Sequence, residues 1–183
     1  MATIRPFMAI RPASNYAAAV AALPYDVMNS EEAREMVKDK PWSFLHVDKA
    51  EVDLPVGTDI YSDEVYQKAK DNLENMIGHG VIGQDLLPNL YIYRLTMNGK
   101  SQTGLVCCTS VDEYINGTIK KHELTRADKE ADRIRHVDTL NANTGPIFLA
   151  YKENPTAKAI IDGWTAAVKP EYNFVSEDGI GHT

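Results

Sequence analysis

The chain has 183 residues, of which 44% are hydrophobic and 25% are charged, and its formal net charge is −7. This composition is typical of a globular protein that buries a sizeable core without disulfides or a structural metal. No apolar run approaches the roughly 18 residues that a membrane-spanning helix needs, and the acidic balance disfavours non-specific binding to nucleic acid. Because the only cysteines, Cys107 and Cys108, are adjacent and cannot join distant segments, we expect a reduced, cytoplasmic protein.

Short elements separated by prolines are predicted at the start of the chain. Two Arg-Pro pairs favour an extended segment within residues 4–12. Ser14 is a candidate N-cap for a helix over residues 16–21, which must end before the proline of the loop LPYDV. That loop contains Asp26, an acid among apolar residues.

A capping box is predicted for the next helix. Asn29, followed three residues later by Glu32, marks the start of a helix over residues 30–39. The apolar run 42–47 (WSFLHV) then predicts a short buried strand. His46 within it is interpreted as a core histidine whose ring nitrogens are satisfied.

The middle of the chain carries the strongest local signals. Residues 48–59 contain prolines, a glycine and several acids, which predicts a loop, and Ser62 is a candidate N-cap for an amphipathic helix over residues 63–77. An antiparallel hairpin is predicted over residues 89–110, because two strand-like runs flank Asn98-Gly99.

The last third predicts alternating helices and strands. In chain order these are a helix from Thr125 to about Val137, a strand over residues 147–151, a helix over residues 155–168 and a strand over residues 172–175. A turn at Asp178-Gly179 follows, and no partner strand is identified after it. We expect one α+β domain over residues 1–183, with a central, partly antiparallel sheet built on the hairpin and helices on its faces.

The densest group of chemically active side chains lies in residues 120–136. These 17 residues hold six of the 19 lysines and arginines, two histidines and four acids. Lys120, Lys121, His122 and Arg126 flank a predicted helix N-terminus, where backbone N–H groups and cations attract phosphate. Glu123 beside them is a candidate general base or metal ligand. The alternative is a solvated helix with weak ion pairs, since its apolar residues Ala127, Ala131, Ile134 and Val137 are few.

Other sites have weaker support. Asp26 is a second candidate base or metal ligand, with the alternative that it caps a turn. The sequence contains no glycine-rich phosphate loop, no serine nucleophile elbow and no zinc ligand set.

Six stretches of the sequence match the pattern of a known protein family, and the segments PYDV and KKHE-x-T-R within them are the most specific. They are IRPFMAIRP, PYDVMNSEEAR, SFLHVDKAEVDLP, the hairpin around LYIYRL, KKHELTRADKEADR and TGPIFLAY. They are distributed along the chain from residue 4 to residue 151, and they resemble a prokaryotic family known as domain of unknown function 1015. Its members are longer and carry an Asp-Gly-His-His-Arg motif that is absent here. From this and the turn near residue 178, we expect an N-terminal portion of a longer protein.

The resemblance implies a function. The missing motif links the family to the fold shared by the partition protein ParB and sulfiredoxin, which includes nucleotide hydrolases and kinases of free serine. We therefore expect a nucleotide-dependent phosphotransferase or hydrolase that acts on a small metabolite such as serine or phosphoserine. The implied cofactor is ATP or ADP with Mg²⁺. If the missing motif completes the phosphate site, this chain alone is inactive.

The resemblance also suggests site residues. The family's polar motif matches Lys120, Lys121, His122, Glu123, Thr125, Arg126, Asp132 and Arg133, and its PYDV matches Asp26. We expect Glu123 and Asp26 to be catalytic. Phosphate or substrate is expected at Lys120, Lys121, His122, Thr125, Arg126 and Arg133.

Two alternatives remain open: a partition-type protein that contacts nucleic acid through residues 120–136, and a regulatory domain without activity. The charge of −7 and the four acids of that segment argue against the first. A phosphorylated small molecule or nucleotide is the expected partner, and neither a membrane nor nucleic acid is expected.

Overall fold

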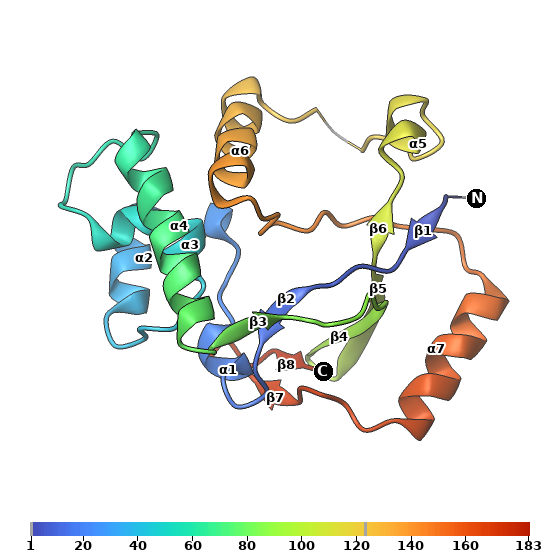
Figure 1. Cartoon of the computed structure of the whole chain (residues 1–183). Helices are drawn as coiled ribbons and strands as arrows, with labels where there is room; N and C mark the ends of the chain where they lie inside the picture. Colours follow the sequence, from blue (N-terminus) through green and yellow to red (C-terminus); the bar gives the residue numbers. More distant parts are fainter. Residues whose placement is uncertain (1, 123) are drawn as a thin grey trace. The chain divides into compact units, whose positions relative to one another are not determined.

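The computed structural model describes residues 2–122 and 124–183, and it combines helices with antiparallel strands (Figure 1). The α+β class expected from the sequence is confirmed. The chain forms two compact units. The helical unit consists of Ile10–Gln84 and Lys120–Pro146, and the sheet unit of Met1–Ala9, Asp85–Ile119 and Ile147–Thr183. Compactness does not by itself make either unit an independent domain, so the single-domain organisation stays a prediction.

The helical unit is built around the long helix α4 (Asp63–Gly78). Of the apolar face predicted for this helix, Val65, Ala69, Leu73 and Met76 are buried, whereas Ile77 is 43% exposed. Helices α3 and α6 both pack against α4, and Val47 of α3 is fully buried. The other elements of this unit are β2 (Ile10–Pro12), α1 (Ala17–Val20), η1 (Tyr25–Val27), α2 (Ser30–Val37), α3 (Leu45–Asp48), η2 (Ala50–Asp53), β3 (Ile82–Gln84) and α6 (Ala127–Leu140).

The sheet unit contains a four-stranded antiparallel sheet in the order β5-β4-β8-β7. The predicted hairpin is confirmed and consists of β4 (Tyr91–Met97) and β5 (Lys100–Val106). At its turn, Asn98 and Gly99 have φ angles of 51° and 74°, the left-handed conformation that a tight Asn-Gly turn requires. The other elements are β1 (Ile4–Arg5), β6 (Cys108–Thr109), α5 (Val111–Ile115), α7 (Pro155–Ala167), β7 (Phe174–Val175) and β8 (Gly181–His182). None of the helices that the described residues form is long and apolar enough to cross a membrane.

Two predicted strands are wrong. In the run 42–47, Leu45 and Val47 belong to α3, where both are buried, because so short an apolar run suits a buried helix as well as a buried strand. Residues 147–151 have no regular structure. Ile147 and Phe148 are 72% and 79% exposed, and no strand within residues 2–122 and 124–183 pairs with this segment. A strand needs such a neighbour for its backbone hydrogen bonds.

The end of the chain also differs from the prediction. Asp178-Gly179 forms the expected turn, with Gly179 at a φ of 81°. The short strand β8 then follows, and it pairs with both β7 and β4 through the partners Val175↔Gly181 and Leu95↔His182. A partner strand therefore does follow the turn. Two residues are too few for a strand to leave a periodic pattern in the sequence.

The predicted capping box is confirmed. The Asn29 side chain accepts from the backbone N–H groups of Glu31 and Glu32, each at 2.9 Å, and the Glu32 carboxylate accepts from the Asn29 N–H at 2.8 Å. The other predicted caps differ: α1 begins after Tyr16 instead of Ser14, Ser62 precedes α4 without a capping hydrogen bond, and α6 begins after Arg126 instead of Thr125.

His46 lies in α3 between two hydrogen-bond acceptors. Its Nδ1 is 2.9 Å from Asp53 Oδ1, and its Nε2 is 3.2 Å from the Lys40 carbonyl. Because both partners accept, the arrangement favours the imidazolium form of the ring, in which both nitrogens carry a hydrogen. The hydrogen bond with Asp53 raises the pKa of His46. Burial alone would raise the pKa of Asp53, but hydrogen bonds from His46 and Asn72 hold it below its usual range.

We expect the His46–Asp53 pair to stabilise the protein more in mildly acidic than in alkaline solution. The pKa of His46 is raised in the folded state, so its contribution is complete below the ordinary value of 6.5 and is lost as the pH rises through the folded pKa. Because the pKa of Asp53 is lowered, the contribution is lost again only in strong acid.

His46→Gln should therefore lower the free energy of unfolding by about 1 kcal/mol at pH 6 and by less at pH 9, as measured by urea denaturation. His79→Gln, at an exposed histidine, serves as the control. An equal loss for His46→Gln at both pH values would contradict the charged pair.

Candidate functional site

The basic segment that precedes α6 lies at the surface. Lys120, Lys121, His122, Thr125 and Arg126 are all exposed. Helix α6 begins directly after Arg126, so these side chains precede a helix end whose first backbone N–H groups attract anions. Glu123, one of the two predicted catalytic residues, lies outside the described residues.

An acidic side chain already binds at this end of α6. Arg126 donates from Nε and Nη2 to the two oxygens of Asp128, at 3.1 and 2.7 Å. The backbone of Asp128 and Lys129 also acts to lower the pKa of this carboxylate. The hydrogen bonds from Arg126 hold the pKa of Asp128 below its usual range. A phosphate at the start of α6 would therefore compete with the Asp128 carboxylate for the same donors.

The PYDV loop contacts α6 through Tyr25. Asp26, the other predicted catalytic residue, is exposed in η1. The guanidinium of Arg133 lies over the Tyr25 ring, 4.2 Å from its centre, which is a favourable cation–π distance. The structure thus brings together two motifs that the sequence singled out, with Tyr25 as the contacting residue.

Two further side chains fix the orientation of Arg133. Its Nε and Nη2 donate to Asp132 Oδ2 at 3.0 and 2.9 Å. The Tyr66 hydroxyl of α4 donates to Asp132 Oδ1 at 2.7 Å. The side chain of Asp132 is only 9% exposed and that of Arg133 28%, so solvent screens this ion pair less than a typical surface pair. Burial and the bond to Asp132 also raise the pKa of Tyr66.

Asp48, His136 and Thr144 lie in the same region, and together with Arg133 we call them the polar cluster. Asp48 ends α3, His136 follows Arg133 on α6, and Thr144 lies just beyond that helix. The charge of Arg133 acts on both Asp48 and His136. Thr144 donates a side-chain hydrogen bond to Asp48. His136 is only 3% exposed, and its Nε2 lies 3.1 Å from the Val47 carbonyl.

Two buried atoms of the polar cluster have no hydrogen-bond partner: Asp48 Oδ1 and His136 Nδ1. Because the Val47 carbonyl accepts, Nε2 of His136 carries the hydrogen, and Nδ1 of the neutral ring presents a lone pair. Both unsatisfied atoms are thus acceptors. Buried polar atoms in native proteins nearly always have partners, so the cluster lacks a group that donates.

Burial shifts both ionisable groups toward their neutral forms. It raises the pKa of Asp48 above the usual carboxyl range, although Thr144, His136 and Arg133 act against this shift. It also lowers the pKa of His136, and the charge of Arg133 acts in the same direction. An acid and a histidine that are both perturbed by burial beside a charged side chain are typical of functional sites.

The polar cluster does not resemble a metal centre. Within residues 2–122 and 124–183, no group of three or more histidine, cysteine, aspartate or glutamate side chains is arranged to hold a metal ion. The nearby cation of Arg133 would also repel a metal bound to Asp48 or His136. The donor set suits a polar organic ligand better.

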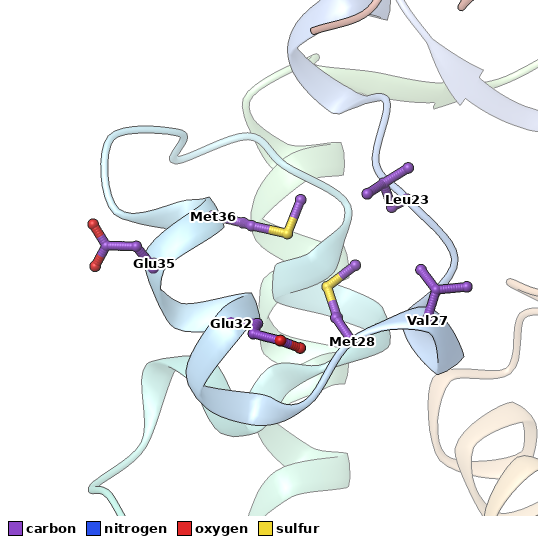
Figure 2. A pocket seen from close by; sticks show the side chains of 6 residues that line it. All are labelled: Leu23, Val27, Met28, Glu32, Glu35 and Met36. Carbon is purple, nitrogen blue, oxygen red and sulfur yellow. The ribbon is translucent and has the colours of Figure 1, made fainter. Parts of the chain in front are cut away.

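A separate hollow of the helical unit has a mainly apolar lining. It is lined by Leu23, Val27, Met28, Glu32, Glu35 and Met36 (Figure 2). Figure 2 shows that Glu35 points away from the other lining side chains. Met28 and Met36 pack against a small core that includes Ala33 and Leu45. The hollow is therefore the edge of this core, and we assign it no chemistry.

Sequence reasoning identified only part of this site. It named Arg133 and included His136 in the charged segment, but it missed Asp48, Thr144 and Tyr66. An acid at the end of the apolar run 42–47 was the available signal for Asp48. The proximity of Asp48 to His136 could not be predicted, because 88 residues separate them and tertiary packing alone brings them together.

Fold and site define an α+β protein with a polar, incompletely satisfied cluster on its helical unit. The sequence pattern of the family described as protein of unknown function (DUF1015) matches residues 4–183. The chain therefore belongs to the DUF1015 family, as the resemblance indicated. Neither a curated protein nor a solved structure matches the chain significantly, and the relation to the fold of ParB and sulfiredoxin stays a prediction.

Replacing the Asp48 carboxylate by an amide should stabilise the protein at neutral and alkaline pH. Because burial raises its folded pKa, ionised Asp48 opposes folding above that pKa, and the opposition disappears below the ordinary value of 3.8. We expect Asp48→Asn to raise the free energy of unfolding by on the order of 1 kcal/mol at pH 8, with a much smaller gain in acid.

Urea denaturation at pH 8 and pH 4 checks this expectation. Asp138→Asn, which replaces an exposed carboxylate on helix α6 by an amide, is the control and should change little. A loss of stability in Asp48→Asn at pH 8 would show that the folded protein favours the charge.

Proposed function

We propose that this chain binds a nucleotide and a small metabolite of the serine or phosphoserine kind. These are the ligands of a nucleotide-dependent phosphotransferase or hydrolase that acts on such a metabolite. Phosphate binds at the exposed residues Lys120, Lys121, His122, Thr125 and Arg126, and the metabolite binds beside Arg133. The observation that carries the proposal is that both sites belong to one helix: the phosphate site precedes the first residue of α6, and Arg133 lies on α6. Arg126 and Arg133 are separated by about 10 Å along the helix, at 1.5 Å per residue.

The contacts of Asp128 support phosphate binding at the start of α6. Arg126 already binds one anionic group there, the carboxylate of Asp128, through two hydrogen bonds. A phosphate oxygen accepts the same hydrogen bonds, and the planar guanidinium fork suits phosphate as well as carboxylate. The start of α6 therefore has the donors for an anion. The Asp128 carboxylate that now accepts from them is exposed, so an incoming phosphate can replace it.

A nucleotide with Mg²⁺ fits the exposed basic segment. Mg²⁺ is usually held by phosphate oxygens and one or two carboxylates, and Asp26 or Glu123 would supply such a carboxylate or act as the general base. The bound nucleotide supplies the phosphoryl group. Of these two acids, Asp26 has the clearer support, since its neighbour Tyr25 stacks on Arg133.

Binding to nucleic acid has less support from the structure. Arg126, Arg133 and Arg135 each form an ion pair with an aspartate, which compensates their charge. A surface that binds nucleic acid through phosphates usually presents uncompensated cations. We therefore do not propose the partition-type function.

Inorganic phosphate, ADP and ATP should each raise the melting temperature of the full chain, and Arg126→Ala should abolish the rise. Ligand at 100 times its dissociation constant stabilises the folded state by about 2.7 kcal/mol. Thermal-shift titration measures the effect. Lys158→Ala removes another exposed cation, one that pairs with Asp162 on α7, and it should behave as wild type. A flat titration with all three ligands would overturn the proposed function.

Removing the Asp128 carboxylate should tighten phosphate binding several-fold, because the internal competitor for Arg126 is lost. Glu130→Gln is the matched control: Glu130 lies in the same first turn of α6, and its replacement changes the net charge equally. Calorimetry should give a lower dissociation constant for Asp128→Asn than for Glu130→Gln. Equal constants would mean that net charge alone is responsible.

A further inference from the structure

We infer that the polar cluster binds an α-amino acid as a zwitterion, with its ammonium group between Asp48 Oδ1 and His136 Nδ1 and its carboxylate on Arg133. The inference deepens the proposed function and rests on it, because it assumes that a small metabolite binds to the helical unit. It adds the protein atoms that hold the metabolite and the two groups of the metabolite that they recognise.

The unsatisfied atoms define one end of the ligand. Asp48 Oδ1 and His136 Nδ1 are both buried and both acceptors. A ligand that completes them must present at least two hydrogens from one small group. An ammonium group carries three N–H donors and a positive charge, which a carboxylate favours. A hydroxyl has one hydrogen and satisfies only one of the two atoms.

Arg133 defines the other end of the ligand. Asp132 accepts from Nε and Nη2 of Arg133 through a single oxygen. The guanidinium has five N–H donors, and the two on Nη1 take no part in this ion pair. Tyr25 and Asp132 hold the guanidinium from its face and its edge. Such a fixed fork binds a carboxylate with little loss of side-chain entropy.

A zwitterion matches the cluster better than an ion of one sign. The acceptors Asp48 and His136 and the donor Arg133 are close enough for the charge of Arg133 to act on both. A carboxylate alone would leave Nδ1 and Oδ1 unsatisfied, and an amine alone would leave the guanidinium without its ligand. Thr144 acts on the Asp48 carboxylate and favours its charged form, which is the form that attracts an ammonium group.

The cluster also gathers segments that the sequence had marked separately. Tyr25 belongs to PYDVMNSEEAR, Asp48 to SFLHVDKAEVDLP, Arg133 to KKHELTRADKEADR and Thr144 to TGPIFLAY. Four of the six stretches on which the resemblance rests thus contribute to one place in the helical unit. This gathering is expected of a binding site.

Saturation-transfer NMR with a mixture of the twenty common amino acids, each at 1 mM, tests the inference on the full chain. At least one amino acid should bind, and its dissociation constant is then measured by calorimetry. Arg133→Met and Asp48→Asn should each raise that constant at least tenfold. No binding by any amino acid would overturn the inference, since water would then satisfy the two acceptors.

Arg135→Met is the matched control. Arg135 lies two residues further on α6, stacks on Tyr66 at 4.4 Å and pairs with Asp63, but it is not part of the polar cluster. Its replacement should change the dissociation constant less than twofold. An equal loss in Arg133→Met and Arg135→Met would mean that any disturbance of α6 abolishes binding, which would overturn the specific role of Arg133.

A ligand series keeps the test independent of variant folding. The amine and the α-hydroxy acid that correspond to the bound amino acid lack its carboxylate and its ammonium group, respectively. Each should bind at least tenfold more weakly to the wild-type chain. If either analogue binds as tightly as the amino acid, the group that it lacks is not recognised and the assignment fails.

The same titrations separate this inference from the proposed function. Amino-acid binding without a thermal shift by phosphate, ADP or ATP would keep the polar cluster as an amino-acid site and remove the phosphotransfer proposal. A nucleotide shift without amino-acid binding would do the reverse.

Discussion

Helix α6 is held on the helical unit mainly by polar contacts, and the candidate site depends on them. Only His136 and Leu140 of this helix are buried. Its Asp132 accepts from the Tyr66 hydroxyl at 2.7 Å, and His136 lies 3.1 Å from the Val47 carbonyl. Arg135 donates to the Tyr61 carbonyl at 2.9 Å. Each of these bonds requires a defined direction, and hydrogen bonds to charged groups contribute about 1.5–3 kcal/mol. Together they determine which face of α6 is turned inward.

That face is not the one that hydrophobicity would choose. Ile134 and Val137 are 60% and 38% exposed, although they are the largest of the few apolar residues in the segment 127–137. Burial of these two side chains would rotate the helix and turn Asp132 and His136 away from Tyr66 and Val47. The protein therefore gives up some apolar burial, about 25 cal/mol per Å², in favour of polar contacts that orient Arg133. Such a choice is expected where a helix has to position charged groups.

The elements that could be predicted from the sequence are those whose signals are local. The capping box of Asn29 and Glu32, the apolar face of α4 and the Asn98-Gly99 hairpin each depend on residues within a few positions of one another. The predicted strands at 42–47 and 147–151 failed because an apolar run does not reveal whether a neighbouring strand exists. The polar cluster could not be predicted for a related reason: the pKa values of Asp48 and His136 are perturbed only because distant segments bury the two side chains.

Two acid–histidine groups in the helical unit show how structural and functional clusters differ. His46 uses both ring nitrogens, and its bond with Asp53 raises the pKa of His46, while that of Asp53 is lowered. In the polar cluster both shifts are reversed, because burial outweighs the partners of Asp48 and His136. The first group is complete within the chain and favours the charged forms. The second leaves Asp48 Oδ1 and His136 Nδ1 without a hydrogen-bond partner in the chain, and these are the atoms to which the proposed amino acid donates.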